Sequence, residues 1–263
     1  MSQLFRYLFN CNKKKIAIIY FGFITISLIL FFNMKGISGV RISGRQDIII
    51  IIFLIVLSIS GFSLLLTGIS SFRKMLKSSM LRYTAVSSQK YICVNVLFFT
   101  LLFTILFVIG IIFLHYFSLN IYERKTDLGV REIFCNLYNY GMLYHVLSAF
   151  LWGVDFVNLL VSIYFIIVLT KLFNVKSSLN KIVFFILFLM FGAFNWFVSD
   201  VLEQIGKYGL IIKNVGFIDK NGFFDTSFYP GEGLTVFNLC FNSLLIFILI
   251  VVTGRIIDKK LEV

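Results

Sequence analysis

One acidic residue stands inside an apolar stretch that is long enough to cross a membrane. Asp155 lies in the run from about Val146 to Phe173, and Asn158 follows three residues later. Residues three apart in a helix lie on nearly the same face, so we expect these polar groups side by side. A charge within a membrane is costly and usually faces the helix bundle or a water path. The pair therefore predicts either a place on a transport path or a structural hydrogen bond to a neighbouring helix.

Side-chain amides are the other notable polar groups within the apolar runs. Asn238 and Asn242 are four residues apart, which places them on one face of a helix. Polar residues of this kind often hold membrane helices together, and that is the main interpretation. Contact with a transported molecule is the alternative. The candidate pathway residues are Asp155, Asn158, Asn195, Asn238 and Asn242.

The chain shows no residue pattern typical of catalysis or of a metal site. It contains no G-x-x-x-x-G-K-[ST] phosphate loop, so we do not expect it to hydrolyse ATP by itself. Its histidines, His115 and His145, lack the spaced carboxylates of a metalloprotease. The four cysteines show no C-x-x-C spacing. A membrane enzyme is therefore the least supported class, and we expect no cofactor bound by this chain.

The composition indicates the elements that position these residues. The chain of 263 residues is 59% hydrophobic and only 14% charged, and a soluble domain of that size needs far more polar surface. Apolar runs of about 18 residues or more indicate membrane spans. The sequence predicts an all-α polytopic membrane protein with one transmembrane domain. The six spans lie at about Ile16–Phe32, Ile48–Ile69, Tyr91–Phe117, Val146–Phe173, Ile182–Val198 and Leu234–Val252.

The distribution of basic residues predicts the orientation of the chain. The net charge of +12 would suggest nucleic-acid binding in a soluble protein, but membrane proteins concentrate Lys and Arg in cytoplasmic segments. With both termini in the cytoplasm, fifteen of the 24 Lys and Arg residues fall inside. We therefore expect a multi-pass protein of the cell membrane. The outer segment 199–233 is the longest, and its helical first half predicts either a re-entrant element or a surface loop.

The segment Ser70–Tyr91, between the second and third predicted spans, is basic and has no acidic residue. Its apolar side chains recur at helical spacing and form one face, while most of its basic side chains point away from that face. It predicts a short cytoplasmic helix that lies on anionic lipid headgroups or docks into a cleft of a partner protein. The residues of this candidate docking site are Phe72, Arg73, Met75, Leu76, Lys77 and Met80.

The stretch "SSFRKMLKSSMLRYTAVSSQKYICVNVLFFTLLFTIL" resembles the junction of the second and third spans in ABC-2 type transporter permeases, the membrane subunits of bacterial ABC exporters. Thr84, Val86 and Ser87 match the T-P-V-S-R-like motif of that family, with Ala85 in place of its proline and Ser88 in place of its basic residue. The later run "LLVSIYFIIVLTKLFNVKSSLNKIVFFILFLMFG" is also similar to these permeases, as is the order of six spans.

This resemblance implies that segment 70–90 is a coupling helix held by a separate ATPase subunit, which would bind ATP and Mg. It also implies that segment 1–15 is an interfacial elbow helix and that a second permease chain, identical or homologous, completes the transporter. The implied cargo is hydrophobic or amphipathic, such as an antimicrobial peptide, a lipid or a drug, in peptide export or self-immunity. A secondary carrier or channel that is not coupled to ATP is the alternative function, and it predicts inverted repeats and broken helices.

Overall fold

The computed structural model describes residues 2–35, 43–77, 87–122, 141–172, 177–206, 211–213, 216–218, 225–227 and 233–261. Most of these residues belong to six helices, each long and apolar enough to cross a membrane. The prediction of six long apolar helices is therefore confirmed, and by length and composition each of them could span a membrane. The helices are α1 (Ser2–Lys35), α2 (Ser43–Lys77), α4 (Ser88–Tyr122), α6 (Gly141–Leu172), α7 (Ser177–Gly206) and α8 (Val236–Ile256).

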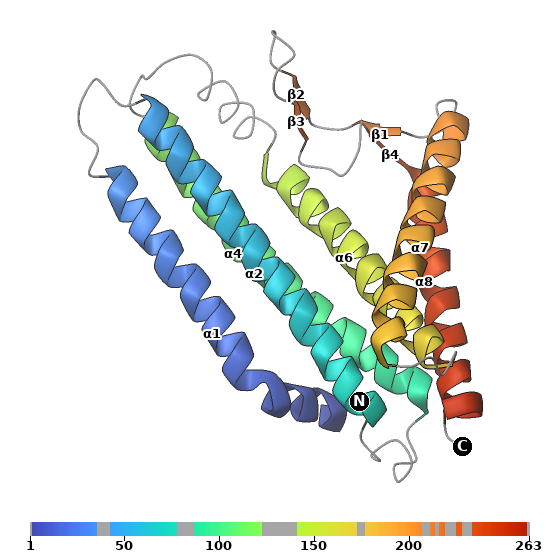
Figure 1. Ribbon diagram of the computed structural model, residues 1–263. Coiled ribbons are helices and arrows are strands. Elements are labelled where there is room, and N and C mark those ends of the chain that lie inside the picture. The colour runs from blue at the N-terminus through green and yellow to red at the C-terminus, as the bar shows by residue number, and fades with distance from the viewer. Residues whose placement is uncertain are drawn as a thin grey trace.

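The helices α1 and α2 extend well beyond the apolar runs that predicted them. The helix α1 begins at Ser2, so segment 1–15 is continuous with the first span over its described residues. The helix α2 runs to Lys77, so the predicted coupling segment begins as the last two turns of the second span. Neither extension contains a glycine or proline that would end a helix. Figure 1 shows that the first turns of α1 nevertheless bend away from the rest of this helix.

The segment between α7 and α8 is only partly helical. The predicted helical propensity of its first half holds as far as Gly206, where α7 ends. Strand β1 (Ile211–Lys213) then pairs in antiparallel fashion with β4 (Gly233–Thr235), and β2 (Gly216–Ile218) pairs with β3 (Asp225–Ser227). The β-branched pair in β1 follows a glycine-containing stretch, which favours a strand over a continued helix. Strand β4 leads directly into α8.

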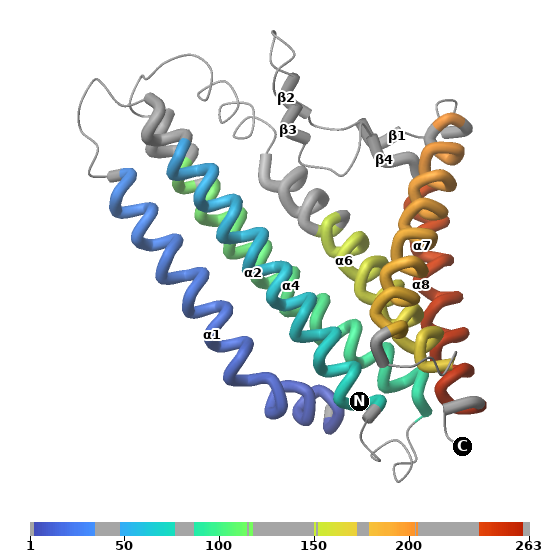
Figure 2. Tube along the Cα trace, viewed as in Figure 1, coloured from blue at the N-terminus to red at the C-terminus, as the bar shows by residue number. Residues whose placement is uncertain are grey.

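The bundle consists of two groups of three helices that share contacts through α4 and α6. The first group is α1, α2 and α4, and the second is α6, α7 and α8 (Figure 1). The helix α4 lies alongside α1 and α2 and also contacts α6 and α8 (Figure 2). The helix α7 packs mainly against α6 and α8. The side chains of α4 and α6 therefore determine how the two groups fit together.

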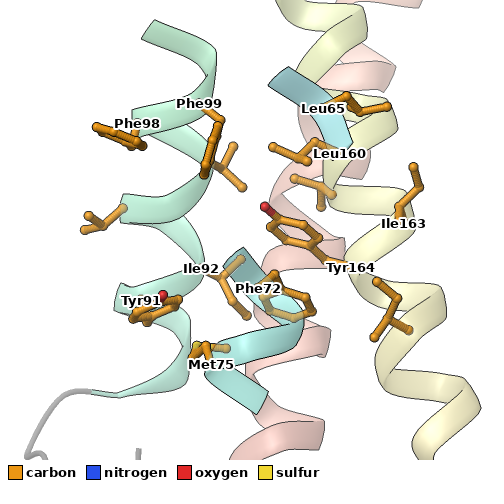
Figure 3. Packing of buried hydrophobic residues seen from close by; sticks show 14 of the residues in the cluster. Leu65, Phe72, Met75, Tyr91, Ile92, Phe98, Phe99, Leu160, Ile163 and Tyr164 are labelled. Carbon is orange, nitrogen blue, oxygen red and sulfur yellow. The ribbon is translucent and has the colours of Figure 1, made fainter. Parts of the chain in front are cut away.

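Two clusters of buried apolar residues divide the bundle along its length. The base cluster draws residues from α1, α2, α4, α6 and α8, including Leu8 and Leu249. Figure 3 shows Phe72, Ile92 and Tyr164 of this cluster. It lies at the end of the bundle that holds both termini (Figure 1). The outer cluster, which contains Phe53 among others, draws its described buried residues from α1, α2 and α4 alone. The two helix groups are therefore joined most extensively at the base.

The end of the chain closes over the beginning of α4. At Ile257 the helix α8 passes into a π-helical segment (Ile257–Leu261), and the Asp258 carboxylate accepts a hydrogen bond of 3.3 Å from the Ser88 backbone N–H. The first N–H groups of a helix lack partners within the helix, so Asp258 caps α4 from a distant part of the chain. The Gln89 Nε2 also donates to the Val251 carbonyl, at 3.5 Å.

The contact between α4 and α8 depends on Gly254, which yields a test of this packing. A Cβ added at Gly254 would overlap the Gln89 side chain and lie 3.1 Å from its backbone nitrogen, whereas a Cβ at Gly192 of α7 would meet nothing within 4 Å. We expect Gly254→Ala to destabilise the protein by about 1–3 kcal/mol through overpacking. The measurement is thermal unfolding in one detergent, with Gly192→Ala as the matched control. Equal melting temperatures for the two variants would contradict the close approach of α4 and α8.

Candidate functional site

Four polar side chains from α6, α7 and α8 form a continuous line of hydrogen bonds, which we call the amide chain. Asn158 Nδ2 donates to Asn242 Oδ1 at 3.3 Å, and Asn242 Nδ2 donates to Asn238 Oδ1 at 3.5 Å. Ser199 Oγ donates to the same Asn238 oxygen at 3.4 Å. Three of the five predicted pathway residues therefore meet and join α6 to α8, and Ser199 adds α7 to the same chain.

Most hydroxyl groups within the spans behave differently from these amides. Each of them donates to a carbonyl one turn earlier in its own helix, which is the usual arrangement for Ser and Thr inside a helix. This group comprises Ser27, Ser60, Ser63, Thr67, Thr100, Thr104, Ser162, Thr170 and Ser243. The polar contacts that connect neighbouring helices therefore come mainly from side-chain amides.

The fourth predicted amide, Asn195, does not join the amide chain. It belongs to α7 and stands one turn before Ser199, which places the two side chains on one face. Its Oδ1 atom is buried and has no hydrogen-bond partner among the residues that the structure describes. Asn195 thus leaves an unused acceptor next to the amide chain.

Asp155 is half-buried on α6, one turn before Asn158. Within the described part of the chain, its carboxylate has neither a hydrogen bond nor an ion pair. The neighbouring amide of Asn158 instead reaches α8, because its Nδ2 donates to Asn242 Oδ1. The structural hydrogen bond that the sequence offered as one interpretation of Asp155 is therefore not formed within these residues.

The side chains next to Asp155 along α6 place it at the margin of the bundle. Trp152, one turn earlier, is 37% exposed, and Leu159, one turn later, is 41% exposed. Phe156 is instead buried and stacks on Phe103 of α4, with ring centroids 4.3 Å apart. Asp155 therefore lies between the side of α6 that packs against the bundle and the side that is open in a single chain.

The apolar face of the predicted docking segment is already covered by the protein itself. Phe72 is 0% exposed and stacks on Tyr164 of α6, with ring centroids 4.0 Å apart and an interplanar angle of 10°. Met75 is also buried and lies in the base cluster with Ile92 of α4 (Figure 3). The prediction that this face docks into a partner therefore needs correction at Phe72 and Met75, because α4 and α6 occupy it.

The charged side of the same segment remains accessible. Arg73 and Lys74 are exposed at the end of α2. Leu76 is half-buried, and its backbone carbonyl accepts a hydrogen bond of 3.3 Å from Lys171 Nζ at the end of α6. The Lys77 side chain and Met80 lie outside the described residues. Any partner that reaches the end of α2 would therefore meet basic side chains first.

A second set of buried polar side chains, which we call the Asn95 network, was not predicted from the sequence. The Tyr164 hydroxyl donates to Asn95 Oδ1 at 2.7 Å and also lies 3.1 Å from the Gly68 carbonyl oxygen. Asn95 Nδ2 and Asn12 Nδ2 both donate to Ser71 Oγ at 3.4 Å. The network joins α1, α2, α4 and α6. An asparagine inside the apolar run of α4 was the available signal, but its partners come from distant segments.

Comparisons of the chain with protein-family models, with curated proteins and with solved structures found no match in any of the three.

The Asn95 network yields a stability prediction with a matched control. Asn95 is completely buried, so replacing it with alanine leaves the Tyr164 hydroxyl and Ser71 without that partner. We expect Asn95→Ala to cost about 1–3 kcal/mol of stability. Asn33 is exposed and bonds to Ile29 of its own helix, so Asn33→Ala should have little effect. Thermal unfolding in detergent measures both variants, and an equally small effect at Asn95 would show that the network does not stabilise the base.

Proposed function

We propose that this chain is the membrane permease subunit of an ATP-driven exporter of the ABC-2 type. Six helices that are long and apolar enough to cross a membrane, and the resemblance of the α2–α4 junction to these permeases, support the proposal. A separate ATPase subunit would bind ATP and Mg, since the sequence has no phosphate loop. A second permease chain would complete the transporter, and the cargo would be hydrophobic or amphipathic.

The observation that carries the proposal is the set of exposed basic side chains at one end of the bundle. Arg73 and Lys74 end α2, Lys90 lies in the first turn of α4, and Arg255 and Lys259 lie near the end of the last helix. Figure 1 shows both termini at this same end. Basic residues concentrate on the cytoplasmic side of membrane proteins, so this end would face the cytoplasm and its ATPase.

The packing of the base supplies a route by which an ATPase could move the spans. The end of α2 is held to α6 by the stacking of Phe72 on Tyr164 and by the bond from Lys171 to the Leu76 carbonyl. The amide chain then joins α6 to α8 and, through Ser199, to α7. A force applied at the exposed end of α2 would therefore reach α6 directly and the other two helices through α6.

An ion-coupled secondary carrier is the second candidate, and Asp155 is the observation that favours it. A carboxylate inside a span is a common element of ion pathways. Within the described helices, however, the spans are continuous and no broken helix of the kind typical of carriers is present. We therefore rank the carrier below the exporter, and the experiment below separates the two.

The proposal is tested by isolating the chain from its native cells in mild detergent and identifying the proteins bound to it. A stoichiometric partner that carries a phosphate-loop ATPase domain is the expected result. An intact preparation without such a partner would overturn the exporter and favour the carrier.

The exposed basic pair of α2 gives a sharper prediction about where the ATPase binds. We expect the double variant Arg73→Glu/Lys74→Glu to reduce the amount of ATPase recovered with the chain by about tenfold or more. The reversed charges would oppose the docking of a complementary surface. The matched control is Lys14→Glu/Lys15→Glu, an equally exposed basic pair on α1. Quantified recovery of the ATPase measures the effect. An equal loss in both variants would show that net charge, and not the end of α2, governs the association.

A further inference from the structure

The face of α6 that carries Asp155 has the composition of a binding site for an organic cation. Asp155 and Trp152 are three residues apart on α6 and therefore share a face. Leu159 continues that face one turn later and is exposed, as is part of Trp152. A carboxylate, an indole ring and an aliphatic side chain are thus presented together on one side of a membrane helix.

Lipid alone is a poor covering for this face. An ionised carboxylate in the hydrocarbon region is costly, and residues of this type normally face protein, water or an opposite charge. Asp155 has no opposite charge among the described residues, and the nearest amide in sequence, Asn158, is held by α8. The position therefore suits a positively charged group, which the described part of the chain does not itself provide.

The neighbouring groups favour an organic cation over a metal ion. Inorganic cations bind several oxygen ligands at once, and no cluster of three or more His, Cys, Asp or Glu residues occurs in the described ranges. Aromatic rings, by contrast, attract ammonium and guanidinium groups through their negative faces. Trp152 lies next to Phe107 of α4, with ring centroids 6.3 Å apart, which extends the aromatic surface across to the second helix.

We infer that Asp155 and Trp152 form a binding site for the cationic group of a hydrophobic cargo, such as an ammonium or guanidinium carried on an apolar body. This inference rests on the proposed exporter function and names the class of molecule that it moves. The carboxylate neutralises the charge, Trp152 contacts the face of the cation, and Leu159 contacts its apolar part. Anionic cargo of equal size and hydrophobicity is excluded by the same carboxylate.

The test uses two probes of nearly the same shape and opposite charge, tetraphenylphosphonium and tetraphenylborate. The chain has two tryptophans, so a Trp196→Phe background leaves Trp152 as the reporter of binding by fluorescence quenching. The full-length protein is purified in nanodiscs of zwitterionic lipid. We expect saturable quenching by the phosphonium and none by the borate. Equal quenching by both ions, or quenching that never saturates, would contradict the proposed cation site, and no further variant would be needed to reach that conclusion.

The carboxylate is then tested in the same background. We expect Asp155→Asn to weaken phosphonium binding by at least about tenfold and Asp155→Glu to restore most of it, because the charge and not the shape is recognised. Asp200→Asn is the matched control, since that carboxylate is exposed near the end of α7 and bonds to Gln204. Unchanged binding in Asp155→Asn, with gel filtration and circular dichroism like the parent, would overturn the inference.

These results are independent of the ATPase experiment. Phosphonium binding in a protein that captures no ATPase would support the cation site and overturn only the exporter. Capture of an ATPase by a protein that binds neither ion would overturn the cation site and leave the exporter in place.

Discussion

A side-chain amide inside a bilayer requires partners that its own helix cannot fully supply. Asparagine has two N–H donors and an acceptor oxygen, and lipid offers no substitute for water. A serine or threonine satisfies its single hydroxyl on the preceding turn, as Thr100 and Thr104 do in α4. Asn95 and Asn158 instead reach other helices. The positions of these two amides therefore decide much of which helices meet and at what level.

The two polar groups built on these amides divide the bundle into overlapping parts. The Asn95 network holds α1, α2, α4 and α6, and the amide chain holds α6, α7 and α8. The helix α6 belongs to both, and it also carries Asp155 on its remaining open face. Relative motion of the two helix groups would therefore act on α6 first, on the helix that carries a carboxylate without a partner among the described residues.

The helical class and the six spans followed from the length of the apolar runs, because that length is a local property of the sequence. Contact among Asn158, Asn238 and Asn242 could also be predicted, since each amide needs a hydrogen-bond partner in an otherwise apolar helix. The covering of Phe72 and Met75 was not. Helical spacing shows that these side chains share a face, but only the positions of α4 and α6 show that the protein itself occupies that face. The strand pairs before α8 were not predicted either, because each pairing joins segments that are separated in the sequence.

The cap that Asp258 places on α4 has a consequence for how the protein is made. The two bonded residues, Ser88 and Asp258, are separated by 170 positions in the chain. At a synthesis rate of about 5–20 residues per second, the first turn of α4 leaves the ribosome roughly 10–30 s before its cap exists. The first turn of α4 therefore emerges with open backbone groups, and its junction with the segment after α8 can close only once residue 258 has been made. A ribosome that stalls after α4 but before residue 258 would leave α4 without its cap. Quality-control proteases could recognise that form.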